Sequence, residues 1–304
     1  MKTYIVGHKN PDTDSIVSAI ALSELEKKLG KDYLPARAGD LNRETEFVLK
    51  RFGFEIPEII PAGEKEVILV DHNEPSQIHE NIKENEIKTI FDHHKLGGLS
   101  TNKAISIRVK PLGSTSTIIA KLFKDKNIEP SKEVAGILIA GIISDTLNFT
   151  SPTNRDVDRK MAEELNIIAG LNLDEFGTEM FKAKSDISGI DTRELISMDY
   201  KIFDMKGKKV GIGVWETVLP EVILEREQEI LKELEKKKQS DSVGLIYFAA
   251  VDIINYKSSL FVVGDEEKVV AEKAFGVKVE NSLAELEGIV SRKSQIAPPI
   301  ETAL

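Results

Sequence analysis

In the first half of the chain, short runs rich in Val and Ile alternate with segments whose apolar residues recur at helical spacing. Strands of nearly continuous apolar residues are typical of a parallel sheet that is covered on both faces. We therefore expect an α/β fold with a Rossmann-like parallel sheet and helices on both sides of it. The expected strands cover residues 3–7, 32–39, 66–72 and 88–94, and the expected helices cover residues 15–30, 42–53, 75–86, 114–127 and 131–146.

The pattern changes after a stretch of Ser, Asp and Gly at residues 185–192, which is typical of a linker. Two more helices are expected before it, at residues 155–170 and 173–184. After it, strands are expected at residues 208–217, 243–254 and 258–264, and one long helix at residues 220–239. We expect an N-terminal domain at residues 1–186, a linker at 187–193, and a smaller C-terminal α/β domain with a mixed sheet at 194–304.

The composition excludes several classes of function. A formal net charge of −10 argues against nucleic acid as a partner, because phosphate backbones are usually bound by a basic face. The chain has no cysteine, so a bound metal would need His and carboxylate ligands. Met1 leads directly into a strand-like run without a signal-peptide pattern, and the apolar stretch 134–143 is too short to span a bilayer. We expect a cytoplasmic protein without a membrane partner.

Acidic and histidine side chains share one position in the predicted sheet. His8 follows the first strand, Asp71 ends the third, and His93 follows the fourth. Because open parallel sheets bind ligands at the carboxyl ends of their strands, we expect these side chains to lie together. The stretch GHKNPDTDS adds two carboxylates, and another follows a strongly apolar helix. The candidate metal ligands are His8, Asp12, Asp14, Asp71, His93 and Asp145.

This mixture of oxygen and imidazole ligands suits Mn²⁺, Mg²⁺ or Co²⁺ better than thiolate-seeking ions. The set is too large for one ion that must also bind water, whereas it suits two ions bridged by a carboxylate. Without cations the crowded carboxylates would repel one another and raise their pKa values. Taken singly, Asp12 and Asp14 have a structural alternative, because Asn-Pro-Asp is a common turn and Asp a common helix cap.

A group of cations lies in the second half of the chain. Arg292 and Lys293 stand in a Ser-flanked turn, and Lys201 follows the linker. Each of them alone is expected to be a surface cation, but together they could donate hydrogen bonds to phosphate oxygens if the C-terminal domain closes over the strand edge. The run GSTST at residues 113–117 opens a helix, where N-capping is the expected role and phosphate binding the alternative.

Five motifs then stand in the order and approximate spacing of a known family: GHKNPDTDS near the start, DHNE at 71–74, DHHK at 92–95, SDT at 144–146 and SRKSQ at 291–295. Along its whole length the chain resembles the manganese-dependent, family II inorganic pyrophosphatases of the DHH phosphoesterase superfamily. The DHH motif alone would also fit oligonucleotide exonucleases. The first and last motifs together are specific to the pyrophosphatases.

The resemblance implies a role for each motif residue. One metal ion would be held by His8, Asp12, Asp71 and Asp145, and the other by Asp14, Asp71, His93 and Asp145. The diphosphate would be contacted by His94, Lys201, Arg292 and Lys293. The resemblance further implies two Mn²⁺ ions with Co²⁺ as a substitute, additional Mg²⁺ that arrives with the substrate, an active site between the two domains, and a homodimer joined through the N-terminal domain.

We therefore expect hydrolysis of inorganic diphosphate to two orthophosphates by a hydroxide that bridges the two ions. One alternative is a DHH-type phosphodiesterase that acts on short oligonucleotides or cyclic dinucleotides, which the acidic net charge and the SRKSQ motif disfavour. Another alternative is a non-catalytic module that only binds metal or anions, which the complete ligand set disfavours.

Overall fold

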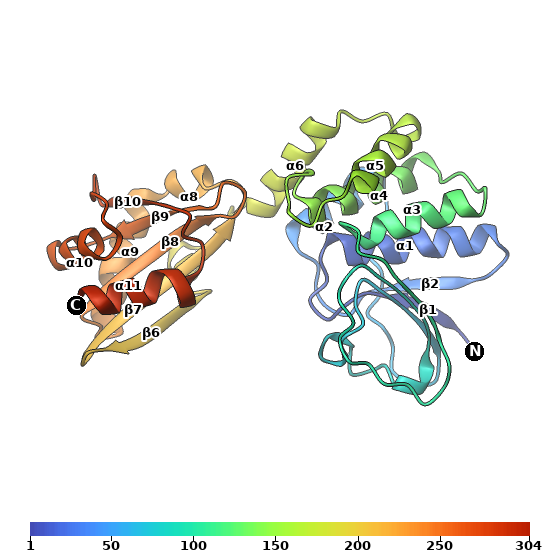
Figure 1. Ribbon diagram of the computed structural model, residues 1–304, viewed down its shortest axis with the longest axis horizontal. Coiled ribbons are helices and arrows are strands. Elements are labelled where there is room, and N and C mark those ends of the chain that lie inside the picture. The colour runs from blue at the N-terminus through green and yellow to red at the C-terminus, as the bar shows by residue number, and fades with distance from the viewer. The chain divides into compact units, whose positions relative to one another are not determined.

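The computed structural model describes all 304 residues and divides the chain into two compact units, Met1–Ala183 and Lys184–Leu304 (Figure 1). Each unit has its own sheet and its own hydrophobic core. The predicted linker at residues 187–193 lies inside the second unit, and its last residues begin the short helix α7 (Thr192–Leu195).

The sheet of the first unit is wholly parallel, as predicted, and its strands follow the order β2-β1-β3-β4-β5. The strand order reverses between β1 and β3, which is the switch point where such sheets bind ligands. The edge strand β5 was not predicted, because its four residues SIRV are short and half polar. The strands are β1 (Thr3–Val6), β2 (Tyr33–Ala36), β3 (Glu66–Val70), β4 (Ile87–Asp92) and β5 (Ser106–Val109).

Six helices belong to this part of the chain, and their N-terminal caps explain several of their starts. The side chains of Asp12, Asn42, Ser114 and Ser131 each accept a backbone N–H of the following helix. The most apolar helix, α4, is buried nearly all round because it packs against both α1 and α5. The helices are α1 (Thr13–Lys28), α2 (Arg43–Phe52), α3 (Thr115–Asp125), α4 (Lys132–Thr146), α5 (Asp156–Ala169) and α6 (Leu173–Ser185).

The two faces of this sheet are covered differently. Ile5 and Ile68 pack into a core built with the α-helices, whereas their neighbours Val6 and Leu69 point to a second cluster that contains no residue of an α-helix. Figure 1 shows the helices gathered on one side of the strands. The prediction of helices on both faces is therefore wrong.

The cause is the segment 75–86, which was predicted as a helix. It forms two separate 3₁₀ turns, Pro75–Gln77 and Glu84–Glu86. The buried Lys65 donates to the carbonyl of Asn81 at 2.7 Å, and the Asn81 side chain donates to the carbonyl of Ile60 at 2.9 Å. These bonds tie the middle of the segment to residues 60–65 and take up the carbonyl of Asn81, which a continuous helix would use internally.

The second unit contains a mixed sheet of order β10-β9-β8-β7-β6, in which only β7 and β8 run parallel. This confirms the predicted mixed sheet. The strands are β6 (Tyr200–Met205), β7 (Lys208–Thr217), β8 (Leu245–Asp252), β9 (Lys257–Val262) and β10 (Leu283–Glu287). None of the helices in either unit combines the length and the apolar character that crossing a bilayer requires.

The helices of the second unit differ from the prediction in two places. The segment 220–239 is interrupted at residues 225–226, where the guanidinium of Arg226 donates to the carbonyls of Ile187 and Ile190 at 2.9 and 2.7 Å. The Ser-flanked turn expected around Arg292 is a π-helical segment, Arg292–Ile296, that continues into the last helix. The helices are α7, α8 (Glu221–Leu224), α9 (Glu227–Ser240), α10 (Asp265–Phe275) and α11 (Ala297–Ala303).

Candidate metal centre

The strand register brings three of the predicted ligands to one edge of the first sheet. Val6 lies opposite Leu69, so that His8 and Asp71, two residues further along, leave β1 and β3 side by side. Asp71 Oδ2 lies 3.5 Å from His8 Nε2, and Asp71 Oδ1 lies 3.3 Å from Nε2 of His93, which follows β4. The carboxylate of Asp71 therefore stands between two imidazoles at the switch point of the sheet.

The backbone of Asp71 supports a functional role. Its φ of 65° is left-handed, which is uncommon for a residue with a side chain. Its N–H is nevertheless fixed by the carbonyl of Phe91 at 2.8 Å. Such strained residues cluster at functional sites, because the surrounding structure must hold them in place.

Asp12 combines the capping role with a position in the cluster. Its Oδ1 accepts the N–H of Ser15 at 2.9 Å and so caps α1, while its Oδ2 lies 3.4 Å from His8 Nε2. Asp12 can therefore cap the helix and take part in the cluster at the same time, because its two carboxylate oxygens face different partners.

Asp14 is fully buried and is held by the first turn of α3. Its two oxygens accept the N–H groups of Thr115 at 2.6 Å and Ser116 at 2.9 Å. Ser114 caps the same helix by accepting the N–H of Thr117 at 3.1 Å, which confirms the predicted N-cap. Because Asp14 uses two of the free amides of α3, those amides are not open to a phosphate.

Asp145 reaches the cluster from the last turn of α4, and its carboxylate lies 3.2 Å from His93 Nε2. A carboxylate at this end of a helix is disfavoured by the helix dipole. A neighbouring cation offsets that repulsion, so the position favours a cation site.

The structure thus brings all six predicted ligands together, in two overlapping groups whose ligand atoms lie within 4.8 Å of one another. Asp71 belongs to both groups. Asp145 is grouped only with the second set, whereas the resemblance implied that it would bridge both ions. These two groups are His8, Asp12 and Asp71, and Asp14, Asp71, His93 and Asp145; a third group of the same kind joins Asp71 and His93 to His94.

The electrostatics of the cluster match a site built for cations. Burial and the charge of Asp71 raise the pKa of Asp14 to about 7, and burial and Asp14 raise the pKa of Asp145 well above its usual value. Burial alone would lower the pKa of His93, but the carboxylates of Asp145 and Asp71 raise it to about 12. In the same way Asp12 and Asp71 raise the pKa of His8 to about 10 against the effect of burial.

Two buried atoms at the centre of the cluster lack hydrogen bonds. Asp71 Oδ2 and His93 Nε2 are inaccessible to solvent, and neither makes a hydrogen bond of good geometry, although oppositely charged groups lie 3.2, 3.3 and 3.5 Å from them. A buried polar atom without a partner is costly unless a bound ion satisfies it. Together with the oxygen and imidazole donors, these two atoms fit divalent cations of the Mn²⁺ type.

His94 is placed differently from His93. Its ring is about half exposed, and both its N–H and its Nδ1 lie against Asp92 Oδ1, at 3.0 and 2.9 Å. This carboxylate raises the pKa of His94. Since Nδ1 is engaged, Nε2 is the ring nitrogen that remains for another partner. Asn73 in turn donates to the second oxygen of Asp92 and so fixes it.

Sequence reasoning missed one acidic residue beneath the cluster. The buried Oε1 of Glu44 in α2 accepts the hydroxyl of Thr13 at 2.7 Å and the hydroxyl of Ser144. These two residues are direct neighbours of ligands, so Glu44 ties the first loop to the end of α4. Nothing in the local sequence distinguishes it from an ordinary helix-start glutamate.

In the second unit, the predicted cations line a cleft of about 490 Å³. Lys201 on β6 and Lys293 are exposed, while the side chain of Arg292 is 10% exposed. Arg292 is held by Asp199, which accepts at its carbonyl at 2.6 Å and at Oδ1 at 2.8 Å. The structure therefore brings the three predicted cations together, and it adds Asp199 as the missed partner of Arg292.

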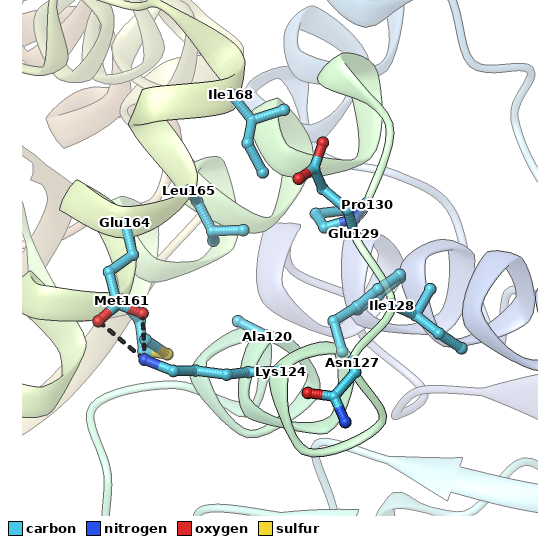
Figure 2. Close-up of a pocket in the computed structure, with 11 residues that line it drawn as sticks. Ala120, Lys124, Asn127, Ile128, Glu129, Pro130, Met161, Glu164, Leu165 and Ile168 are labelled. Atoms are coloured by element: carbon cyan, nitrogen blue, oxygen red, sulfur yellow. Dashed lines mark hydrogen bonds and ion pairs between the residues drawn. The ribbon is translucent and has the colours of Figure 1, made fainter.

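Two further cavities lie in the first unit. One of about 290 Å³ opens beside the metal cluster and is lined by His8, Asp12, Asp71 and His94, with Lys95 at its wall. The other, of about 370 Å³, lies between the end of α3 and α5 (Figure 2). Its walls are mainly apolar, and Lys124 forms an ion pair with Glu164 at its side. It holds no group of metal-ligating side chains.

Comparison with known proteins agrees with this geometry. The chain matches the model of the DHH family N-terminal domain at residues 2–142 and that of the DHHA2 domain at residues 178–303. It is 47% identical to a manganese-dependent inorganic pyrophosphatase of Methanocaldococcus jannaschii and 43% identical to one of Methanothrix thermoacetophila, covering 99% of this chain and 98% and 97% of the relatives.

A solved structure from Methanococcus jannaschii, assigned to the family II inorganic pyrophosphatases, is 45% identical and has a TM-score of 0.65 with 99% of both chains covered. The fold and the site define a DHH-type protein with a carboxylate and imidazole centre at the switch point of its sheet. The chain belongs to the manganese-dependent inorganic pyrophosphatases, as the motifs predicted.

Proposed function

We propose that this chain hydrolyses inorganic diphosphate to two orthophosphates at a dinuclear manganese site. The observation that carries the proposal is the pair of overlapping ligand groups that share Asp71. A shared carboxylate can hold two divalent ions a few ångström apart, and such pairs clamp both the attacking and the leaving oxygen of an in-line displacement. The manganese dependence of the named relatives supports the choice of metal.

The proposed first ion is held by His8, Asp12, Asp71 and Asp145, and the second by Asp14, Asp71, His93 and Asp145. When bound, the two ions would supply Lewis acidity and a bridging hydroxide as the nucleophile. Co²⁺ is the proposed substitute because it accepts the same oxygen and nitrogen donors. Additional Mg²⁺ would enter as part of the diphosphate complex.

The chain's own contribution is to bind and orient the diphosphate. We assign Lys201, Arg292 and Lys293 as donors to its phosphate oxygens, where they would stabilise the charge that develops on the leaving phosphate. The bidentate contact of Arg292 with Asp199 supports this role, because it fixes the guanidinium before substrate binds. His94 would contact a phosphate oxygen through Nε2, since Asp92 engages Nδ1.

The proposal includes a homodimer joined through the first unit. Its support is β5, which pairs only with β4 and exposes 53% of Ile107 at the open edge of the sheet. The cytoplasmic location predicted from the sequence stays a prediction.

A substrate comparison tests the proposed reaction. Phosphate release would be measured with Mn²⁺ and diphosphate, and product release with a short oligonucleotide and a cyclic dinucleotide under the same conditions. We expect rapid release from diphosphate only. Cleavage of the nucleotides with no release from diphosphate would favour the phosphodiesterase alternative, and no turnover of any of them would favour a binding module.

A further inference from the structure

We propose that Asp158, on α5 and outside the ligand set, is a positioning residue for the second metal ion. The inference rests on the proposed metal site. Asp158 is completely buried and touches none of the six ligands directly; it acts through the segment 112–117 that leads into α3.

The carboxylate of Asp158 clamps this segment at two points. Its Oδ2 accepts the N–H of Gly113 at 2.8 Å, and its Oδ1 accepts the hydroxyl of Thr117 at 2.6 Å. The contact is close, because a Cβ added to Gly113 would lie 2.7 Å from Oδ2. A glycine is therefore needed where the chain passes the carboxylate.

The clamped segment in turn holds three of the second ion's ligands. The carbonyl of Leu112 lies 3.0 Å from His93 Nδ1, which directs the opposite nitrogen of the ring into the cluster. The N–H groups of Thr115 and Ser116 bind the carboxylate of Asp14. The hydroxyl of Thr115 also donates to Asp71 Oδ1 at 3.0 Å.

The first ion's ligands are supported from elsewhere. His8 and Asp12 belong to the loop before α1, and their side chains contact each other, Asp71 and the start of α1. Of the first ion's proposed ligands, only Asp71 accepts a hydrogen bond from the clamped segment. Loss of the clamp should therefore lower the affinity for the second ion more than the affinity for the first. This difference distinguishes the proposal from a purely structural role.

Asp158 also has a structural role that must be separated from this one. Its Oδ2 accepts the N–H of Arg155 at 2.8 Å and so helps to begin α5. Replacing the residue could thus lower stability without any effect on metal binding. A readout that distinguishes the two metal ions is needed.

The test is a Mn²⁺ titration of the metal-free full-length chain, followed by calorimetry and by the paramagnetic resonance signal of unbound Mn²⁺. The dissociation constant that is lost in Asp14→Ala belongs to the second ion, and Asp158→Ala should raise that constant about 10- to 100-fold, the usual cost of removing a group that orients metal ligands, and change the other far less. Thr117→Val, which keeps the bond to Arg155 but removes one arm of the clamp, should shift the same constant in the same direction.

Two controls separate the outcomes. Asp158→Asn can still accept from Gly113 and Arg155 and should keep most of the affinity. Ser131→Ala removes the cap of α4, where Ser131 accepts the N–H of Val134, and should lower the melting temperature without changing either constant. The proposal would be overturned if Asp158→Ala raised both Mn²⁺ dissociation constants equally. It would also be overturned if the variant lowered the melting temperature and left both constants unchanged. A wild-type chain that binds fewer than two Mn²⁺ ions would instead overturn the metal site itself.

Discussion

Nε2 of His93 lies 3.2 Å from a carboxylate oxygen of Asp145, although one residue follows β4 and the other ends α4. In the metal-free chain the neighbouring carboxylates raise the pKa of His93, so that this imidazole keeps its proton at neutral pH. A divalent ion bound by the same two side chains would take the place of that proton.

Metal binding should release protons and strengthen as pH rises. The pKa values of His8 and His93, about 10 and about 12, lie above neutral pH, so that both rings carry a proton that Mn²⁺ must displace. Because the pKa of Asp14 is raised to about 7, its carboxylate also takes up a proton as the pH falls below neutral. Mn²⁺ must displace that proton as well. Calorimetric titrations between pH 6 and 9, in buffers of different ionisation enthalpy, would measure the effect. Affinity that does not depend on pH would be inconsistent with it.

Asp14→Ala should remove the second ion and leave the first. The substitution deletes one ligand of that ion and leaves the N–H groups of Thr115 and Ser116 without their buried acceptor. Metal analysis after gel filtration should give about one Mn²⁺ per chain instead of two, and the rate of phosphate release should fall by at least about 100-fold. Unchanged metal content and rate would remove Asp14 from the ligand set.

Lys293→Ala should weaken the handling of diphosphate without loss of metal. The side chain lines the cleft of the second unit and is proposed to bind a phosphate oxygen. A loss of about 10-fold in kcat/KM is expected for one charge-assisted contact, with both Mn²⁺ dissociation constants unchanged. Lys278→Ala, at an exposed lysine outside the cleft, is the matched control. Loss of metal from Lys293→Ala would contradict the assigned role.

Asp199→Ala should act on the same cleft through Arg292. Without the Oδ1 acceptor, the guanidinium keeps only its bond to the Asp199 carbonyl and is less well oriented. KM for diphosphate should rise several-fold while the metal affinities stay constant, and Asp199→Asn should recover part of the loss. An unchanged KM would mean that Asp199 has no part in holding Arg292 for substrate.

Much of the candidate metal centre could be predicted because its proposed ligands stand at places that the sequence pattern marks. His8, Asp71 and His93 each follow a Val/Ile-rich strand, and parallel strands bring their carboxyl ends to a common edge. Asp12 and Asp14 were harder to assign, because an N-cap and a ligand have the same sequence signature. In the structure Asp12 caps α1 with one carboxylate oxygen and faces His8 in the cluster with the other.

The residues that hold the ligands could not be found in this way. Glu44 and Asp158 each stand in the first turn of a helix, where an acidic residue is common in any protein. Only tertiary packing shows that they reach the ligand-bearing segments. The same limit applies to the wrong helix at 75–86, because the bonds that tie Asn81 to Lys65 and Ile60 are tertiary contacts that the local pattern does not show.

The central claim is that two manganese ions in the Asp71-centred cluster are needed to hydrolyse diphosphate. It is tested most directly by adding Mn²⁺ stepwise to the metal-free chain at a protein concentration well above both dissociation constants and measuring phosphate release at each step. If both ions are needed, little phosphate is released after the first equivalent, and release rises until it levels off at two equivalents per chain. Full activity at one equivalent, or no release from diphosphate at any metal content, would contradict it.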